Sequence, residues 1–102
     1  MIHVIATIEV QPGRREEFLG EFRRIVPTVR AEEGCLEYGP TVDARTAITT
    51  QPPRRENVAV VVEKWASLAA LEKHMVAPHM QEYRVRVKAL VAKVELRILE
   101  PA

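Results

Sequence analysis

Two histidines, His74 and His79, stand out in the segment LEKHMVAPHMQEY because histidine is well suited to moving protons. Its unperturbed pKa of about 6.5 lets an imidazole take up a proton near neutral pH. On a regular helix the two side chains would lie about 140° apart, and Pro78 separates them in the sequence. We expect one of them to act as a catalytic base or a substrate anchor. The alternative is that both cap helices or form interface hydrogen bonds.

Six further side chains are candidates for lining a small-molecule pocket beside these histidines. An indole or a phenol supplies a flat wall for an aromatic ligand, and a carboxylate can orient a histidine or bind a substrate hydroxyl. The alternative for each is a structural role in the core, in a salt bridge or as a histidine with satisfied hydrogen bonds. The candidate pocket residues are Trp65, Tyr83, Tyr38, Glu63, Asp43 and His3.

The sequence carries no recognisable pattern for a metal or a cofactor. His74 and His79 would need further ligands to hold a metal ion, and the other candidate acids and His3 are distant from them along the chain. No glycine-rich phosphate loop is present. The single cysteine, Cys35, has no basic residue within three positions to activate its thiol. We therefore expect neither a metal nor a bound cofactor.

Composition narrows the classes of partner. The 102 residues fit one domain, 1–102, and 15 basic against 14 acidic residues give a net charge of +1, which does not favour a nucleic-acid partner. No apolar run approaches the roughly 18 residues that span a bilayer, and the first residues do not resemble a signal peptide. One cysteine cannot form an internal disulfide. We expect a cytoplasmic protein with no membrane partner.

The hydrophobic pattern predicts a β-α-β-β-α-β order of elements. A helical stripe of apolar residues and an alternating strand pattern are the main signals, and Gly34 is expected to cap the first helix. The predicted elements are a strand at 2–10, a helix at 14–32, a strand at 35–43, a long connection at 44–56, a strand from 58 to 65, a helical region after Ser67 that breaks at Pro78, and a strand at 93–99.

This order is typical of a ferredoxin-like α+β fold, a four-stranded antiparallel sheet with helices on one face. Val4, Ala6 and Ile8 alternate along the first strand and are expected to meet the helices. The opposite face carries apolar residues from 58–62, VAVVV. Burial of that face against a second copy predicts a homodimer whose sheets pack face to face.

Several segments resemble the antibiotic biosynthesis monooxygenase family of the dimeric α/β-barrel superfamily. They are MIHVIATIEVQPGRREEF at the start, EEGCLEY at 32–38, EKW at 63–65 and LEKHMVAPHMQEY at 71–83. The resemblance covers essentially the whole chain. It implies a dimer of ferredoxin-like subunits, each with a pocket between sheet and helices. The connection at 44–56 departs from the family because it is longer and richer in proline, so it is a candidate for a pocket cover or an arm across a dimer.

The resemblance also implies an activity. Family members oxidise electron-rich phenols, anthrones or quinols with O₂ and use no metal or flavin, because such substrates reduce O₂ themselves once deprotonated. The protein then supplies a base and a dry pocket. We expect a monooxygenase acting on a small aromatic, quinol or polyphenol ligand. Two alternatives remain open: an isomerase of the same fold that uses a His base without O₂, and a non-enzymatic, stress-related dimer that binds a small ligand.

Overall fold

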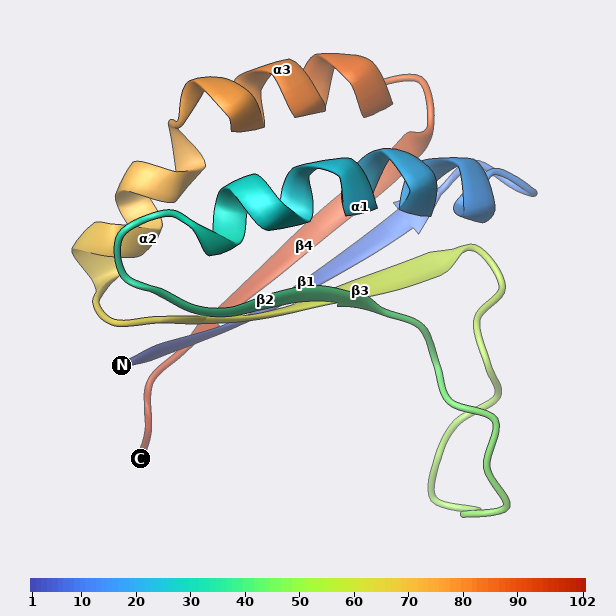
Figure 1. The fold of residues 1–102 in the computed structure, drawn as a ribbon. Coiled ribbons are helices and arrows are strands. Elements are labelled where there is room, and N and C mark those ends of the chain that lie inside the picture. Colours follow the sequence, from blue (N-terminus) through green and yellow to red (C-terminus); the bar gives the residue numbers. More distant parts are fainter.

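The sheet has four strands and three helices cover one of its faces. The computed structural model describes residues 1–102 (Figure 1), and its elements in chain order are β1 (Ile2–Val10), α1 (Arg15–Arg30), β2 (Cys35–Thr41), β3 (Val58–Trp65), α2 (Leu68–Met75), α3 (Pro78–Val87) and β4 (Val91–Leu99). The strands pair antiparallel in the order β2-β3-β1-β4. The predicted ferredoxin-like α+β fold is confirmed. No helix is both long and apolar enough to cross a membrane.

Strict alternation along β1 and β3 separates the two faces of the sheet. In β1 the even-numbered residues from Val4 to Val10 are buried, and in β3 the buried residues are the odd-numbered ones from Ala59 to Trp65. The register pairs Val4 with Glu63 and Ala6 with Val61, so these rows share the face that meets the helices. Ile5, Thr7, Val60 and Val62 consequently point to the helix-free face.

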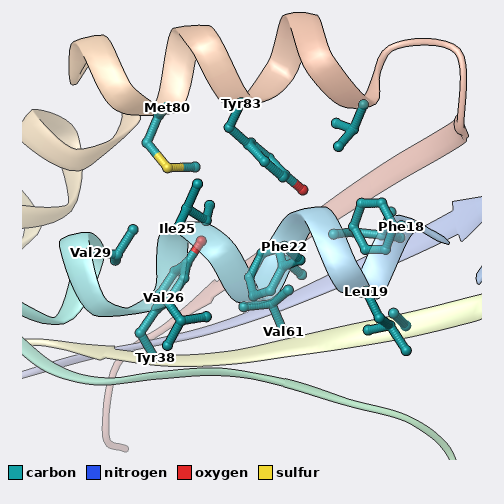
Figure 2. Close-up of a cluster of buried hydrophobic side chains, with 14 of the residues drawn as sticks. Phe18, Leu19, Phe22, Ile25, Val26, Val29, Tyr38, Val61, Met80 and Tyr83 are labelled. Atoms are coloured by element: carbon teal, nitrogen blue, oxygen red, sulfur yellow. The ribbon is translucent and has the colours of Figure 1, made fainter. Parts of the chain in front are cut away.

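The helix α1 packs on the sheet through a single apolar stripe, as predicted. Its buried residues recur at helical spacing from Phe18 to Val29 (Figure 2). The helix ends earlier than expected: Arg30 is its last residue and Ala31 is its C-cap. Gly34 therefore is not the cap. With a φ of +83° it forms the turn that leads into β2, a conformation that glycine adopts without a steric penalty.

Pro78 divides the second helical region into α2 and α3, as the sequence predicts. The hydroxyl of Ser67 caps α2 by accepting a hydrogen bond from the backbone N–H of Ala70 at 3.1 Å. Pro78 then opens α3 at its first position, where the missing N–H costs nothing. The break turns α3 back over α1 (Figure 1). It also places His74 at the end of one helix and His79 at the start of the next.

The connection between β2 and β3 projects away from the helices (Figure 1). It contains no helix or strand. Its base is closed by Asp43, whose carboxylate accepts hydrogen bonds from the backbone and the guanidinium of Arg55 at 2.8–2.9 Å. No residue of this segment lines the apolar pocket of the chain, so the segment does not cover the pocket of its own subunit.

Candidate active site

A cavity of about 420 Å³ lies between α3 and the helix-facing side of the sheet. This volume is within the range of small-molecule sites. Most of its wall is apolar, with Phe22 from α1, Met80 and Val87 from α3, and Ala6 and Ile8 from β1. β4 closes one side only loosely, through the partly exposed apolar side chains of Val94 and Leu96. The polar groups on this wall are few, and four of them come from His74, Glu63, Tyr38 and Tyr83.

His74 is buried, with 2% of its surface exposed, and lines the cavity. Its Nδ1 lies 2.9 Å from Oε2 of Glu32. Nε2 of His74 has no hydrogen-bond partner in the protein. Since every fully enclosed side-chain polar atom of the chain has one, Nε2 is not fully enclosed and meets the open cavity. Burial lowers the pKa of His74, although the hydrogen bond and charge of Glu32 oppose that shift. The imidazole is thus neutral near pH 7, with its proton on Nδ1 and a free lone pair on Nε2.

Glu32 joins the two histidines, although no sequence pattern marked it. The same Oε2 lies 2.8 Å from Nε2 of His79. His79 does not line the cavity, and 28% of its side chain is exposed. The link depends on the turn after α1, because Gly34 packs so closely on α2 that an added Cβ would lie 2.6 Å from Cβ of Ala70. In the sequence this turn belongs to the segment EEGCLEY, which resembles the family but does not indicate a hydrogen-bond partner for a histidine.

Glu32, His74 and His79 are also the one group whose side chains could together hold a metal ion, since their three ligand atoms lie within 4.8 Å of one another. A tetrahedral zinc ion with bonds of about 2.1 Å would hold its ligand atoms about 3.4 Å apart. The two separations to the carboxylate oxygen, 2.9 and 2.8 Å, are instead hydrogen-bond distances. The group has the geometry of a hydrogen-bonded triad.

Glu63 places a buried carboxyl group in the cavity wall. Oε1 accepts a hydrogen bond from Nε1 of Trp65 at 2.9 Å, and the other oxygen has no protein partner. Burial raises the pKa of Glu63 to about 7, with a further increase from the charge of Glu32, whereas the Trp65 bond lowers it. The group is therefore close to half-protonated at neutral pH. Trp65 is itself fully buried and does not line the cavity; its ring centroid lies 4.6 Å from that of His74.

Tyr38 and Tyr83 reach the cavity from opposite sides, one from β2 and the other from α3 (Figure 2). The ring of Phe22 stacks on Tyr38 at a centroid distance of 5.5 Å and meets Tyr83 edge-on at 5.8 Å. Burial raises the pKa of both phenols well above the ordinary value. Both phenols therefore stay protonated. Neither hydroxyl has a protein partner, so each can donate a hydrogen bond to a ligand in the cavity.

Two candidate pocket residues lie elsewhere. His3 is in β1 but points to the helix-free face, since its neighbours in the strand, Ile2 and Val4, point toward the helices. Asp43 lies at the base of the long connection, where it pairs with Arg55. Alternation along β1 predicted the facing of His3, whereas no local pattern predicted the partner of Asp43. The cavity thus brings together His74, Glu63 and the two tyrosines. Trp65 and His79 do not line it, but Trp65 is hydrogen-bonded to Glu63 and His79 to Glu32.

Comparison with known proteins gives a consistent result. Residues 1–86 match the family described as antibiotic biosynthesis monooxygenase. The chain is 42% identical to a protein of Escherichia coli K12 named "Probable quinol monooxygenase YgiN", over 99% of this chain and 98% of that protein.

Solved structures agree with this comparison. PA3566 from Pseudomonas aeruginosa superimposes with a TM-score of 0.80 at 30% identity, over 99% of this chain and 93% of that one. Rv0793 from Mycobacterium tuberculosis superimposes with a TM-score of 0.80 at 26% identity, over 99% and 94%. The chain therefore belongs to the antibiotic biosynthesis monooxygenase family.

Proposed function

We propose that the chain is a cofactor-independent monooxygenase that oxidises a small quinol-like aromatic with O₂. The observation that carries the proposal is the free Nε2 of His74 in an apolar cavity, with Nδ1 held by Glu32. This is the arrangement of a general base, because the bonded carboxylate fixes the tautomer and stabilises the imidazolium that forms. The similarity to a relative named as a quinol monooxygenase supports the substrate class.

In the proposed reaction His74 removes the proton of a substrate hydroxyl. The aryloxide that results is electron-rich and passes one electron to O₂, which gives superoxide and a substrate radical. Their combination at a ring carbon that bears hydrogen forms a hydroperoxide, and loss of water leaves a new carbonyl. For a quinol the sum is quinol plus O₂ giving hydroxyquinone plus water, so one oxygen atom enters the product and four electrons reduce O₂.

The groups around the cavity can stabilise the charges that these reaction steps create. Superoxide and peroxide are anions, and the protonated hydroxyls of Tyr38 and Tyr83 can donate hydrogen bonds to them. Glu63, with a pKa of about 7, can hold or release a proton when water leaves. The apolar wall of Phe22 and Met80 excludes water from the radical pair.

We also propose that the chain acts as a homodimer whose sheets pack face to face. The helix-free face carries Ile5, Val60 and Val62, half-buried in the single subunit and in adjacent register. Apolar side chains concentrated on one face of a sheet favour burial against another surface. A second copy presents the same surface, and a two-fold axis would bring the same patch of both copies together.

The function is tested by O₂ consumption of metal-stripped protein with a panel of quinols and polyphenols. Wild type should consume O₂ above the uncatalysed rate, and His74→Ala should lose about 10²–10⁴-fold in kcat while its circular dichroism is unchanged. His79→Ala should lose less, because His79 does not line the cavity. Turnover that persists without O₂ would favour the isomerase alternative. Tight binding without turnover of any compound would favour the ligand-binding dimer.

A further inference from the structure

The open side of the cavity carries two cationic side chains that no acid of the chain neutralises. Arg84 and Lys88 both line the cavity from α3 and its C-cap. Neither takes part in any of the chain's salt bridges. By contrast Arg86, between them in sequence, faces away and pairs with Glu21 at 3.3 Å.

The spacing of these two cations is that of one helical turn. Residues four apart lie on the same side of a helix, and like charges there repel each other. Favourable interaction with the end of the helix dipole explains why cations occur in this last turn, but it acts on Arg86 equally. It does not explain why, of these three cations, the two without an ion pair are the ones that line the cavity.

Arg84 is also fixed close to the proposed base. Its Nη2 donates a hydrogen bond to the backbone carbonyl of Met75 at 2.8 Å, which anchors the guanidinium at the junction of α2 and α3. Met75 directly follows His74, and the charge of Arg84 is near enough to contribute to lowering the pKa of His74. A guanidinium held by one nitrogen keeps its other N–H groups available to a ligand.

We infer that the substrate carries an anionic group, such as a carboxylate, next to its reactive hydroxyl, and that Arg84 and Lys88 bind this group. The inference rests on the proposed function and specifies the substrate class. A ring that lies against the apolar wall with its hydroxyl at His74 would direct a neighbouring carboxylate toward these two side chains. Both are exposed, so the anion stays partly hydrated at the mouth and avoids the cost of full burial.

The test compares two naphthoquinols that differ only in a carboxylate beside one hydroxyl. Wild type should show the higher kcat/KM for the carboxylate, by about fivefold to tenfold, because two exposed charge pairs contribute and each gives up to about fivefold. In Lys88→Met this ratio should fall several-fold, mainly through KM, and in Lys88→Glu it should invert. Lys73→Met, which removes an exposed cation of α2 that does not line the cavity, should leave the ratio at the wild-type value.

Binding separates this inference from the oxygenase proposal. Anaerobic calorimetry with hydroxynaphthoate and with naphthol, which lacks the carboxylate, measures the preference without turnover. Tighter binding of the carboxylate by wild type, reduced in Lys88→Met, supports the anion site even if no quinol is oxidised. Equal affinity for both compounds, or a preference unchanged in both Lys88 variants, overturns the anion site and leaves the oxygenase reaction standing.

Discussion

Nδ1 of the buried His74 lies 2.9 Å from Oε2 of Glu32, which follows α1 in the turn to β2. Two influences on the imidazole therefore oppose each other. Burial lowers the pKa of His74, and the bond to Glu32 raises it. Of the charged groups that act on it, His79 and Arg84 also lower its pKa. Glu32 is thus the group that keeps a buried histidine basic enough to accept a proton.

Glu32→Gln should lower the pKa of His74 further and slow the reaction. The amide keeps the shape but loses the negative charge that stabilises the imidazolium. If its N–H₂ group faces Nδ1 of His74, it donates to that nitrogen and the imidazole proton moves to Nε2. We expect kcat to fall by part of the about 10²–10⁴-fold that a general base contributes. Nitrogen NMR of the imidazoles measures the pKa. The exposed neighbour provides the control, since Glu33→Gln should change neither quantity. An unaltered His74 titration in Glu32→Gln would contradict the role of Glu32.

Glu63 should make stability depend on pH in the range 4.5 to 7. Burial raises the pKa of this group from 4.5 to about 7 in the folded state, so the folded protein binds the proton more tightly than the unfolded chain. Its contribution is fully present below pH 4.5 and is lost as the pH rises through 7. A shift of this size corresponds to about 3 kcal/mol.

Urea unfolding of wild type and Glu63→Gln at several pH values tests this dependence. The glutamine retains an acceptor for Nε1 of Trp65 but cannot ionise, so its stability should fall less between pH 4.5 and 8. His74 contributes a pH dependence of the opposite sign: because its pKa is lowered in the folded state, its contribution to stability is present above pH 6.5 and is lost as the pH falls. Both proteins contain His74, so this contribution cancels in the difference between their free energies of unfolding. Glu72→Gln, at an exposed position of α2, should follow wild type. Parallel curves for wild type and Glu63→Gln would refute the perturbed carboxyl.

The fold was largely accessible from the sequence because its signals are local. Alternation in β1 and β3, the apolar stripe of α1 and the break at Pro78 each act over fewer than about 20 residues. The error at Gly34 also has a physical cause. A glycine after a helical stripe usually caps the helix, but here its positive φ serves a turn that begins after the helix has already ended.

The site was less accessible because its contacts join distant segments. His74 was a candidate by residue type, but its partner Glu32 is 42 positions away and lies in the turn after α1, next to the exposed Glu33. Glu63 was a candidate for orienting a histidine or binding a substrate hydroxyl, but its raised pKa was not foreseen, because that shift comes from burial, which a sequence pattern does not quantify. Asp43 was a candidate pocket residue, but its partner, Arg55, lies in the same connection between β2 and β3 and keeps it away from the cavity.

Val62→Glu should dissociate the proposed dimer. Val62 lies on the helix-free face of the central strand β3 and pairs with Ile5 of β1. A carboxylate there would be buried without a partner in a face-to-face dimer, but would meet water in a single subunit. Light scattering after size exclusion should show a dimer for wild type and a monomer for the variant. The exposed change Val85→Glu on α3 is the control and should remain dimeric. A wild-type monomer would contradict the dimer directly.

Gly34→Ala should destabilise the protein and disturb the site together. A φ of +83° costs alanine about 1–2 kcal/mol, and the new Cβ would lie 2.6 Å from Cβ of Ala70, so α2 must move. Gly20→Ala is the matched control, because nothing lies within 4 Å of its added Cβ and a glycine within a helix costs about 0.5–1 kcal/mol relative to alanine.

Thermal unfolding should thus rank Gly20→Ala above wild type and Gly34→Ala below it. Since the turn at Gly34 carries Glu32 toward His74, only Gly34→Ala should also shift the titration of that histidine in the folded protein. A stable Gly34→Ala variant with a wild-type His74 titration would show that the close contact with α2 does not position Glu32. Loss of stability with an unshifted titration would assign the contact to folding alone, because the carboxylate would then be held by its hydrogen bonds to the two histidines.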